Sequence, residues 1–374
     1  MKGFIASFFL LSFLAACSSS KSPSSDPPFD APTVAQLEAA VTKVMADHQM
    51  PGVIVGAWFP GRGEYVVAKG VRDRTTGEPM TTDLHFRIGS NTKAYVGTVV
   101  LQLVDEGRIK LDDTIGGRFP WVKRGNEITI RMLLNMTSGI PSYTEIEQFG
   151  ADAIADPHRA WTRQMLFDYV KDLPLRFDPG TRYHYSNTNT ILLGMIVEAT
   201  TGKTIAQSLQ ERIYDRMGFT GTSWGQSQMP TPFAHGYAQI TSGALTDISD
   251  WAPGWADAAG QIVSTMKDLK PWAKTLANPT LISPAMHAQR TTWVTLPGTF
   301  PEGRYGLALG TAGGWYHHQG TMPGYNSIAA YLPEMDATIV VLANTETRYG
   351  GLTPAFGMLT ALSNILSPQY SPGK

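Results

Sequence analysis

The chain is short of cysteine and of any excess of charge. Its 374 residues include a single cysteine, Cys17, so no disulfide can form within the chain. The 30 Lys and Arg residues nearly match the 31 Asp and Glu residues, which gives a formal net charge of -1. No long run of either sign occurs, and this balance excludes the charge signature of proteins that bind nucleic acids or acidic polymers.

Metal-ligand motifs and internal repeats are missing too. There is no His-Glu-x-x-His or comparable cluster, and the adjacent His317 and His318 would point to opposite faces of a strand. No repeat of fixed period is found. In contrast, 43% of the residues are hydrophobic, and 9 Trp, 14 Tyr and 15 Phe argue against disorder. The chain is long enough to bury one large core or two cooperating cores.

The first residues predict export. Met1-Lys2 is basic, and the apolar run of residues 4–16 has the length of a signal peptide rather than of a membrane span. It ends in Leu14-Ala15-Ala16-Cys17, which looks like a bacterial lipobox, and residues 18–28 are polar and rich in Ser and Pro. We therefore expect a signal peptide over 1–16, lipidation of Cys17 and a flexible tether over 17–32. The alternative is an ordinary secretory signal with a chance cysteine.

Hydrophobic periodicity predicts an α+β fold. Helical spacing occupies residues 33–48, 90–106 and 353–366, and strand patterns occupy 53–58, 65–68, 314–318, 327–332 and 338–342. Strands at both ends with short helices between them predict one antiparallel sheet with an inserted helical region. The expected hydrolase domain covers 33–368, with the sheet from about 50–75 and 303–366 and the helical region over about 110–285.

A Ser-x-x-Lys pair, Ser90 and Lys93, opens the second of these helices. Residues three apart share a helix face, so the amine can take the proton of the hydroxyl. Ser90 would also lie at the positive end of the helix dipole, which favours an oxyanion beside it. Two other pairs fit the pattern: Ser18 and Lys21 lie in the tether, and the pair at 264 and 267 looks like a helix N-cap.

Two further motifs follow along the chain. Tyr185-Ser186-Asn187 comes directly before an apolar helix, where a phenol can relay a proton and an amide can hold a substrate. The alternative is a buried tyrosine and an N-cap asparagine. On a late strand stands His318-Gln319-Gly320-Thr321, where Gly320 would let a substrate backbone lie along the strand edge.

A competing nucleophile is Ser223, which lies in a Gly-x-Ser-x-Gly sequence. That motif requires a strand before it and a helix after it. Here a helical pattern precedes Ser223 and a polar, proline-bearing stretch follows it. We therefore prefer Ser90.

The order of the three motifs resembles that of the serine β-lactamase and penicillin-binding protein superfamily, in its class C β-lactamase and D-Ala-D-Ala carboxypeptidase branch. The likeness runs over about 33–366, and further similar stretches are residues 133–141, 177–180, 258–265, 324–327 and 341–344. It implies a five-stranded antiparallel sheet flanked by helices, with an all-helical region beside it.

The resemblance also implies roles for the motif residues. Ser90 would be acylated, and either Lys93 or Tyr185 would be the general base. Tyr185 would return a proton to the leaving group, and Asn187 would hold the acyl-side amide. The backbone N–H groups of Ser90 and Thr321 would form the oxyanion hole.

The third motif departs from the family pattern of Lys-Thr-Gly or His-Thr-Gly. His318 replaces a lysine that is always cationic near neutrality, and Gln319 replaces a threonine that helps to bind a carboxylate. Together with Gly320 and Thr321, these residues are the predicted substrate-binding strand. Relatives with a looser third motif include esterases, amidases and D-amino-acid peptidases.

These expectations combine into a lipid-anchored, monomeric serine hydrolase that faces the periplasm or cell exterior. The expected substrates are D-Ala-D-Ala-type peptides of the cell wall. The alternatives are an esterase, a weak β-lactamase and, from another class, a non-catalytic binding lipoprotein. No cofactor or metal is expected, because acyl transfer on Ser90 needs none.

Overall fold

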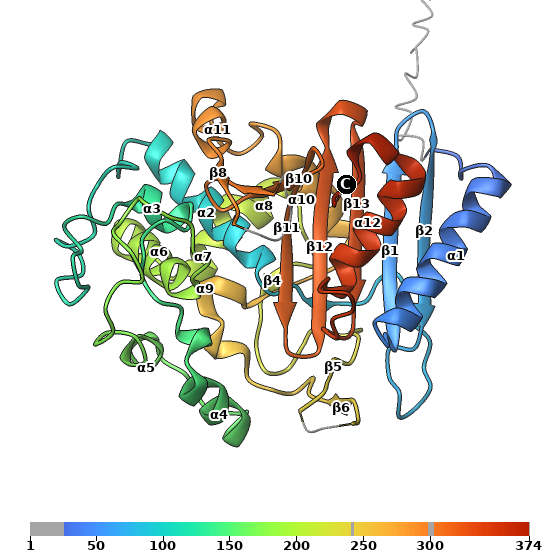
Figure 1. The fold of residues 1–374 in the computed structure, drawn as a ribbon, viewed down its shortest axis with the longest axis horizontal. Helices are drawn as coiled ribbons and strands as arrows, with labels where there is room; N and C mark the ends of the chain where they lie inside the picture. Colours follow the sequence, from blue (N-terminus) through green and yellow to red (C-terminus); the bar gives the residue numbers. More distant parts are fainter. Residues whose placement is uncertain (1–25, 241–242, 298–302, 374) are drawn as a thin grey trace, which may run out of the picture.

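The computed structural model describes residues 26–240, 243–297 and 303–373. The predicted signal peptide and Cys17 lie outside these residues. The domain has two parts, a large sheet covered by helices and a helical region beside it (Figure 1). In Figure 1 the first strands, in blue, lie next to the last strands, in red, so the two ends of the chain build one sheet.

The main sheet is antiparallel and has five long strands in the order β2-β1-β13-β12-β11. Their bounds are β1 (Gly52–Phe59), β2 (Gly63–Gly70), β11 (Trp315–Met322), β12 (Tyr325–Leu332) and β13 (Ala337–Ala343). The long strands confirm the predicted architecture. Beyond β11 the sheet continues through three short strands, β10 (Gly310–Ala312), β9 (Arg304–Tyr305) and β8 (Val294–Thr295), which makes eight strands instead of five.

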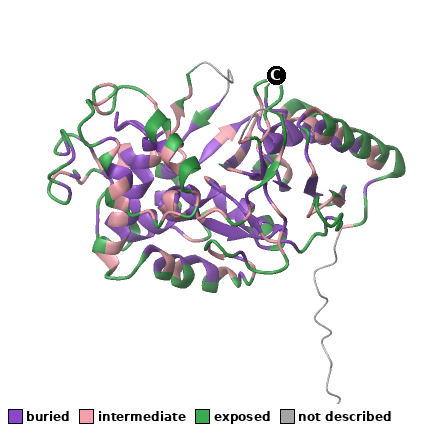
Figure 2. Cartoon of the chain, turned by 90° about the horizontal axis from the view of Figure 1, so that it is seen from below, coloured by how far each residue is buried: buried purple, intermediate pink, exposed green. Residues whose placement is uncertain are grey.

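Helices cover both faces of this sheet, which explains why its central strands β1, β12 and β13 are buried along their whole length. Val53 and Val55 of β1 belong to a core shared with α1 (Ala31–Asp47) and α12 (Pro354–Leu366). Ile54 faces the other way, into the larger core shared with α2 (Asn91–Asp105) and α10 (Met266–Leu276). Figure 2 shows the buried residues concentrated in the strands and central helices, with exposed residues on the outer helix surfaces.

The folded domain begins earlier in the chain than the predicted boundary at residue 33. Helix α1 begins at Ala31, and the carboxylate of Asp30 accepts a hydrogen bond from Thr33 N at 2.8 Å as its N-cap. Phe29 packs against Phe59, with ring centroids 6.0 Å apart. The last residues of the predicted tether therefore belong to the folded domain.

The helical region is built from short elements. They are α3 (Ile130–Leu134), α4 (Glu147–Ala155), α5 (Arg163–Asp168), α6 (Asn187–Thr201), α7 (Ile205–Leu209), the π-helix η2 (Gln210–Tyr214), α8 (Asp215–Met217), α9 (Asp257–Gly260) and α11 (Pro284–Arg290). The 3₁₀ helices in the described part of the chain are η1 (Tyr143–Glu145), η3 (Pro253–Trp255), η4 (Pro333–Met335) and η5 (Pro368–Tyr370).

This region is not wholly helical, contrary to the prediction. A small sheet joins β3 (Phe86–Arg87), β7 (Ile262–Ser264) and β4 (Ser223–Trp224), and β5 (Tyr237–Ala238) pairs with β6 (Thr246–Asp247). Strands of two or three residues carry too little alternation to be seen in the sequence.

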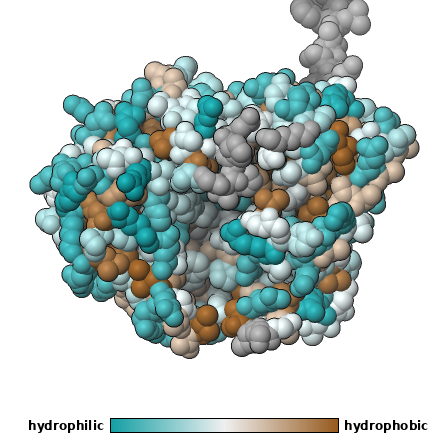
Figure 3. Space-filling model, viewed as in Figure 1, coloured by the Kyte–Doolittle hydropathy of each residue, from teal (hydrophilic) through white to brown (hydrophobic). Residues whose placement is uncertain are grey.

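The surface is that of an ordinary folded domain. Hydrophilic side chains cover most of the face seen in Figure 3, and hydrophobic ones are scattered among them. Within the described residues, no helix combines the length and the apolar character needed to cross a bilayer.

Candidate active site

A close contact between backbones places Ser90. Gly89, with φ +51°, turns the chain into α2, and a Cβ on it would lie 2.8 Å from backbone atoms of Thr321 in β11. A Cβ on Gly320 would lie 1.8 Å from the carbonyl oxygen of Ile88. Only glycine permits this approach. Glycine at positions 89 and 320 therefore lets the turn that carries Ser90, at the start of α2, pack directly against the end of β11.

The function expected for Gly320 needs correction. It was predicted to make room for a substrate backbone, but its missing side chain makes room for the turn before Ser90. The strand edge that the prediction required is nevertheless present, because β10 pairs only with Trp315, Tyr316 and His317 of β11. In the described residues, no strand pairs with the remainder of that edge.

Lys93 reaches Ser90 from one turn further along α2. Its Nζ donates to Ser90 Oγ at 3.0 Å and to the carbonyl oxygen of Ala259 at 2.7 Å. The side chain is completely buried, and among the described residues no carboxylate forms an ion pair with it. Burial lowers the pKa of Lys93 well below its usual value. An amine in this state can accept the serine proton.

Tyr185 and Asn187 lie at the same place, at the start of α6. Lys93 Nζ is 4.9 Å from the centroid of the Tyr185 ring. Burial raises the pKa of Tyr185, while a hydrogen bond with Ser90 acts in the opposite direction, so the phenol keeps its proton. The amide of Asn187 donates to Thr144 Oγ1 at 2.8 Å. The helix N-cap is Ser186, so the alternative of an N-cap asparagine is wrong.

The histidine of the third motif is uncharged. Its Nδ1 lies 2.7 Å from the carbonyl oxygen of Gln319, which can only accept, so Nδ1 carries the proton. Nε2 then accepts from the hydroxyl of Tyr305 at 2.9 Å. Burial is the main cause that lowers the pKa of His318 to about 3. The third motif consequently offers no positive charge at neutral pH.

The neighbouring histidine belongs to the other face of the strand, as predicted. The ring of His317 packs edge-on against Phe356 of α12, with centroids 5.7 Å apart. Burial lowers its pKa to about 4. The described residues contain no group of three or more His, Cys, Asp or Glu side chains able to hold a metal ion.

The remaining two residues of the motif are held by neighbours. Gln319 Oε1 accepts from the hydroxyl of Thr353, the N-cap of α12, at 3.0 Å. Thr321 Oγ1 accepts from Asn326 Nδ2 at 2.8 Å. All the predicted site residues except Cys17 therefore converge on the junction of α2, α6 and β11.

Ser90 opens into two cavities. The larger, of about 530 Å³, is also lined by Tyr185, His318 and Arg304. The smaller, of about 420 Å³, is also lined by Asn187 and Trp255. Both volumes lie in the range of small-molecule sites. A nucleophile between two cavities can hold the acyl part of a substrate on one side and the leaving group on the other.

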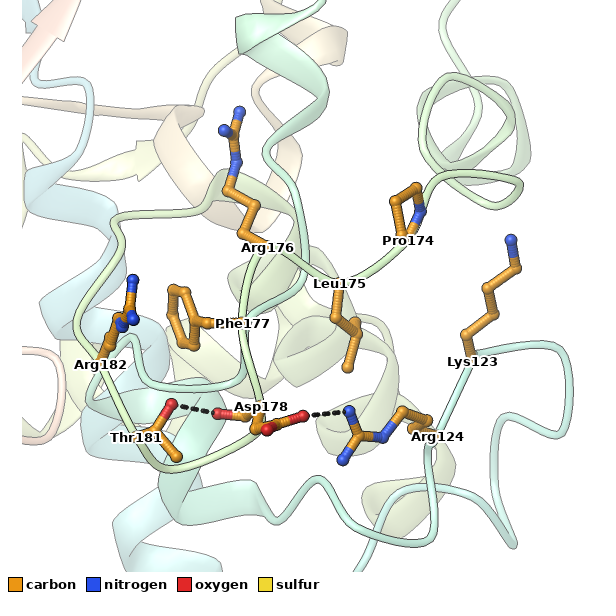
Figure 4. Close-up of a pocket in the computed structure, with 9 residues that line it drawn as sticks. All are labelled: Lys123, Arg124, Pro174, Leu175, Arg176, Phe177, Asp178, Thr181 and Arg182. Carbon is orange, nitrogen blue, oxygen red and sulfur yellow. Dashed lines mark hydrogen bonds and ion pairs between the residues drawn. The ribbon is translucent and has the colours of Figure 1, made fainter.

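A third cavity lies away from these residues, and Figure 4 shows its lining. It holds four cationic side chains, but Arg124 is bound to Asp178 at 2.6 Å and Arg176 to Glu145. Its lining contains no residue of the three motifs. We assign it no catalytic part.

The competing serines have structural surroundings. Ser264 Oγ lies 2.9 Å from Thr222 Oγ1, and the N-cap of α10 is Thr265. Ser223 is part of the short strand β4, with no strand–turn–helix elbow around it. Ser18 and Lys21 lie outside the described residues.

Sequence reasoning missed two groups that complete the site. The carbonyl of Ala259 holds the lysine, and Tyr305 fixes the tautomer of His318. The stretch 258–265 was noted for its similarity, but nothing in it marked a backbone carbonyl as a ligand of Lys93. Tyr305 lies next to none of the three motifs, and no feature of the sequence marked it as a site residue.

Comparison with known proteins agrees with this geometry. The family model described as Beta-lactamase matches residues 37–359. Protein flp of Staphylococcus aureus (strain MW2) is 27% identical over 286 residues, which cover 71% of this chain and 53% of flp. The match thus spans about half the length of that curated relative.

Solved structures resemble nearly the whole domain. A D-stereospecific amidohydrolase from Streptomyces sp. is 29% identical, with a TM-score of 0.79 over 89% of this chain and 98% of that one. The D-amino acid amidase from Ochrobactrum anthropi SV3, complexed with L-phenylalanine amide, is 26% identical, with a TM-score of 0.75 over 88% and 97%. Because the family model covers most of the sequence, the chain belongs to the beta-lactamase family of serine hydrolases.

Proposed function

We propose that the protein cleaves amide bonds of D-aminoacyl compounds through an acyl-enzyme on Ser90. The main support for this proposal is Lys93. Its side chain is buried and forms no ion pair within the described residues, and its Nζ lies 3.0 Å from Ser90 Oγ. Removing the proton of Ser90 makes its oxygen a nucleophile toward a substrate carbonyl.

The two pKa directions support Lys93 as the base and Tyr185 as the acid. Lys93, whose pKa is lowered by burial, would take the Ser90 proton as the C–O bond forms. Tyr185, with its raised pKa, keeps a proton that it gives to the leaving nitrogen as the C–N bond breaks. The Lys93 ammonium then restores that proton to Tyr185. Water repeats the sequence in deacylation and frees Ser90.

The oxyanion of the tetrahedral intermediate would lie between the backbone N–H groups of Ser90 and Thr321. The close packing of Gly89 on Thr321 supports this assignment, because it fixes the two residues next to each other. Donors held in place by the fold need no reorganisation during the reaction. Asn187, held by Thr144, would donate to the acyl part of the substrate.

An uncharged third motif favours amides over substrates that end in a carboxylate. The predicted lysine substitute, His318, is neutral and already bound to Tyr305 and Gln319. Two solved relatives of similar structure are a D-stereospecific amidohydrolase and a D-amino acid amidase. Both observations support a D-aminoacyl amide as the substrate.

A second candidate is the predicted D-Ala-D-Ala carboxypeptidase activity. Its support comes from Arg304 and Arg348, exposed guanidinium groups that line the larger cavity. Neither forms a salt bridge within the described residues. Such groups can bind a terminal carboxylate in place of the motif lysine.

For its cellular place, we propose an exported protein anchored by a lipid on Cys17. The support is the lipobox-like sequence before Cys17 and the polar residues after it. Such an anchor would keep the site near the cell wall.

One substrate panel tests these proposals. Purified protein is incubated with D-phenylalanine amide, a D-Ala-D-Ala peptide, the same peptide with an amidated C-terminus, nitrocefin and a p-nitrophenyl ester. Cleavage of the first and third substrates in preference to the free peptide supports the amidase. Preference for the free carboxylate supports the carboxypeptidase, and cleavage of the ester or nitrocefin alone contradicts both.

A further inference from the structure

The smaller cavity beside Ser90 contains a carboxyl group that no catalytic step uses. Glu346 follows β13 and lines this cavity together with Ser90 and Asn187. Its Oε2 accepts a hydrogen bond from the backbone N–H of Gly324 at 2.5 Å. A partly buried acid in a substrate cavity needs either a protein partner or a ligand.

No cation of the protein serves as that partner. Among the described residues Glu346 forms no salt bridge, and the lining of its cavity includes no Lys, Arg or His. Tyr143 is the other ionisable side chain of the lining, and its hydroxyl donates to the carbonyl of Trp255. The nearest arginine in sequence, Arg348, lines the larger cavity instead.

The electrostatics of Glu346 suit a site that binds a cation. Desolvation raises its pKa to about 7, and only the backbone N–H groups of Gly324 and of Glu346 itself act against this. A cationic ligand next to the carboxylate would stabilise its ionised form. In this cavity that ligand would be a cationic group of the substrate.

The walls around Glu346 suit an organic cation. Tyr143, Phe149, Trp251 and Trp255 line the same 420 Å³ cavity. Aromatic faces attract ammonium groups and pack against apolar side chains. Asn187, proposed to hold the acyl part of the substrate, lines both cavities. The charges distinguish them: Arg304 and Arg348 line the larger cavity and would repel an ammonium group, so we assign the amine-bearing acyl part to the smaller cavity and the leaving group to the larger.

We propose that Glu346 binds the free ammonium group of the acyl residue, so that the preferred substrates are D-aminoacyl compounds with an unblocked α-amine and an apolar or aromatic side chain. This inference rests on the proposed function for the identity of the acyl side. It deepens that proposal by separating free-amine substrates from N-acylated ones, such as peptides cleaved far from their N-terminus.

The test measures binding without turnover. In a Ser90→Ala background at pH 7, calorimetry gives the Kd of D-phenylalanine amide and of N-acetyl-D-phenylalanine amide, which differ at the amine. Glu346→Gln keeps the size of the side chain and an acceptor for Gly324. It should weaken binding of the free amine about 10- to 100-fold, the loss typical of a hydrogen bond between charged groups. Binding of the acetylated amide should not change.

A matched control is Glu147→Gln, which removes the same charge from the exposed first turn of α4. It should leave both constants unchanged. Any of three results would overturn the assignment. Glu346→Gln could affect both ligands equally, it could affect neither, or the Ser90→Ala protein could fail to bind the free amine. Turnover of D-phenylalanine amide by the wild-type enzyme is measured separately. Amine binding that depends on Glu346 without any turnover would refute the proposed reaction and leave this site intact.

Discussion

Replacing Lys93 by Met should make the protein more stable while it abolishes acylation. In the folded protein the amine is fully buried, with a pKa well below its usual value. In the unfolded chain a lysine titrates near pH ~10.4. At pH 7 the unfolded state therefore binds more protons than the folded state, and each pH unit by which burial lowers the pKa of Lys93 favours unfolding by about 1.4 kcal/mol.

The expected gain is smaller, because the variant also loses contacts. Methionine fills much of the same space but leaves the carbonyl of Ala259 without its donor, at a cost of about 1 kcal/mol. Lys93→Met should still be the more stable protein at pH 7, because a lowering of the pKa of Lys93 by a single unit already offsets this loss. This is an example of stability given up at an active site.

The dependence on pH is the sharper signature. The stability of the wild type should rise with pH up to the pKa of the unfolded lysine, by about 1.4 kcal/mol per pH unit relative to the variant. Urea denaturation of both proteins between pH ~7 and ~9 measures this slope. A difference in stability that stays constant over that range would show that Lys93 is protonated in the fold, and the assignment of the base would be refuted.

Three further predictions concern the catalytic tyrosine, the glycine of the third motif and the anchor. Tyr185→Phe should lower kcat by about 10²- to 10⁴-fold with unchanged thermal stability, because only the proton relay is lost; a near-normal kcat would contradict this role. Gly320→Ala should destabilise the domain by about 3 kcal/mol or more, since its Cβ would lie 1.8 Å from the Ile88 carbonyl oxygen. Gly117→Ala, whose Cβ would meet nothing within 4 Å, is the control, and equal melting temperatures would refute the packing argument. Cys17→Ala should move the protein from the membrane fraction to the soluble fraction, and an unchanged distribution would argue against lipidation.

Much of the fold was predictable because long elements carry strong patterns. Helix α2 was expected over 90–106 and runs over Asn91–Asp105, and α12 was expected over 353–366 and begins one residue later. Four of the five long strands were found because each holds apolar residues in succession, whereas β11 was found from the alternating pattern of its first residues. The short strands β8, β9 and β10 were missed, because two or three residues show no periodicity.

The site was predictable as a set of residues but not as an electrostatic state. The order of the motifs predicted that Ser90, Lys93 and Tyr185 share one site. The pKa of Lys93, in contrast, depends on its burial by elements that are distant in the sequence. The same is true of His318, whose neutrality depends on packing with Tyr305. Burial of a single side chain is a tertiary property that local sequence does not encode.

The carboxyl of Glu346 illustrates the same limit. It stands two residues after Asn344, just beyond a stretch, 341–344, that was noted only for its similarity to the family. Nothing in that stretch predicts that its side chain lines a cavity with Ser90, some 250 residues earlier in the chain.

The central claim is that Ser90 is the nucleophile, and covalent labelling tests it most directly. The protein is treated with a fluorophosphonate probe, digested, and the labelled peptide is identified by mass spectrometry. We predict a single adduct on the peptide that contains Ser90, and no adduct after Ser90→Ala. Labelling that persists in Ser90→Ala, or that maps to Ser223, would contradict the account.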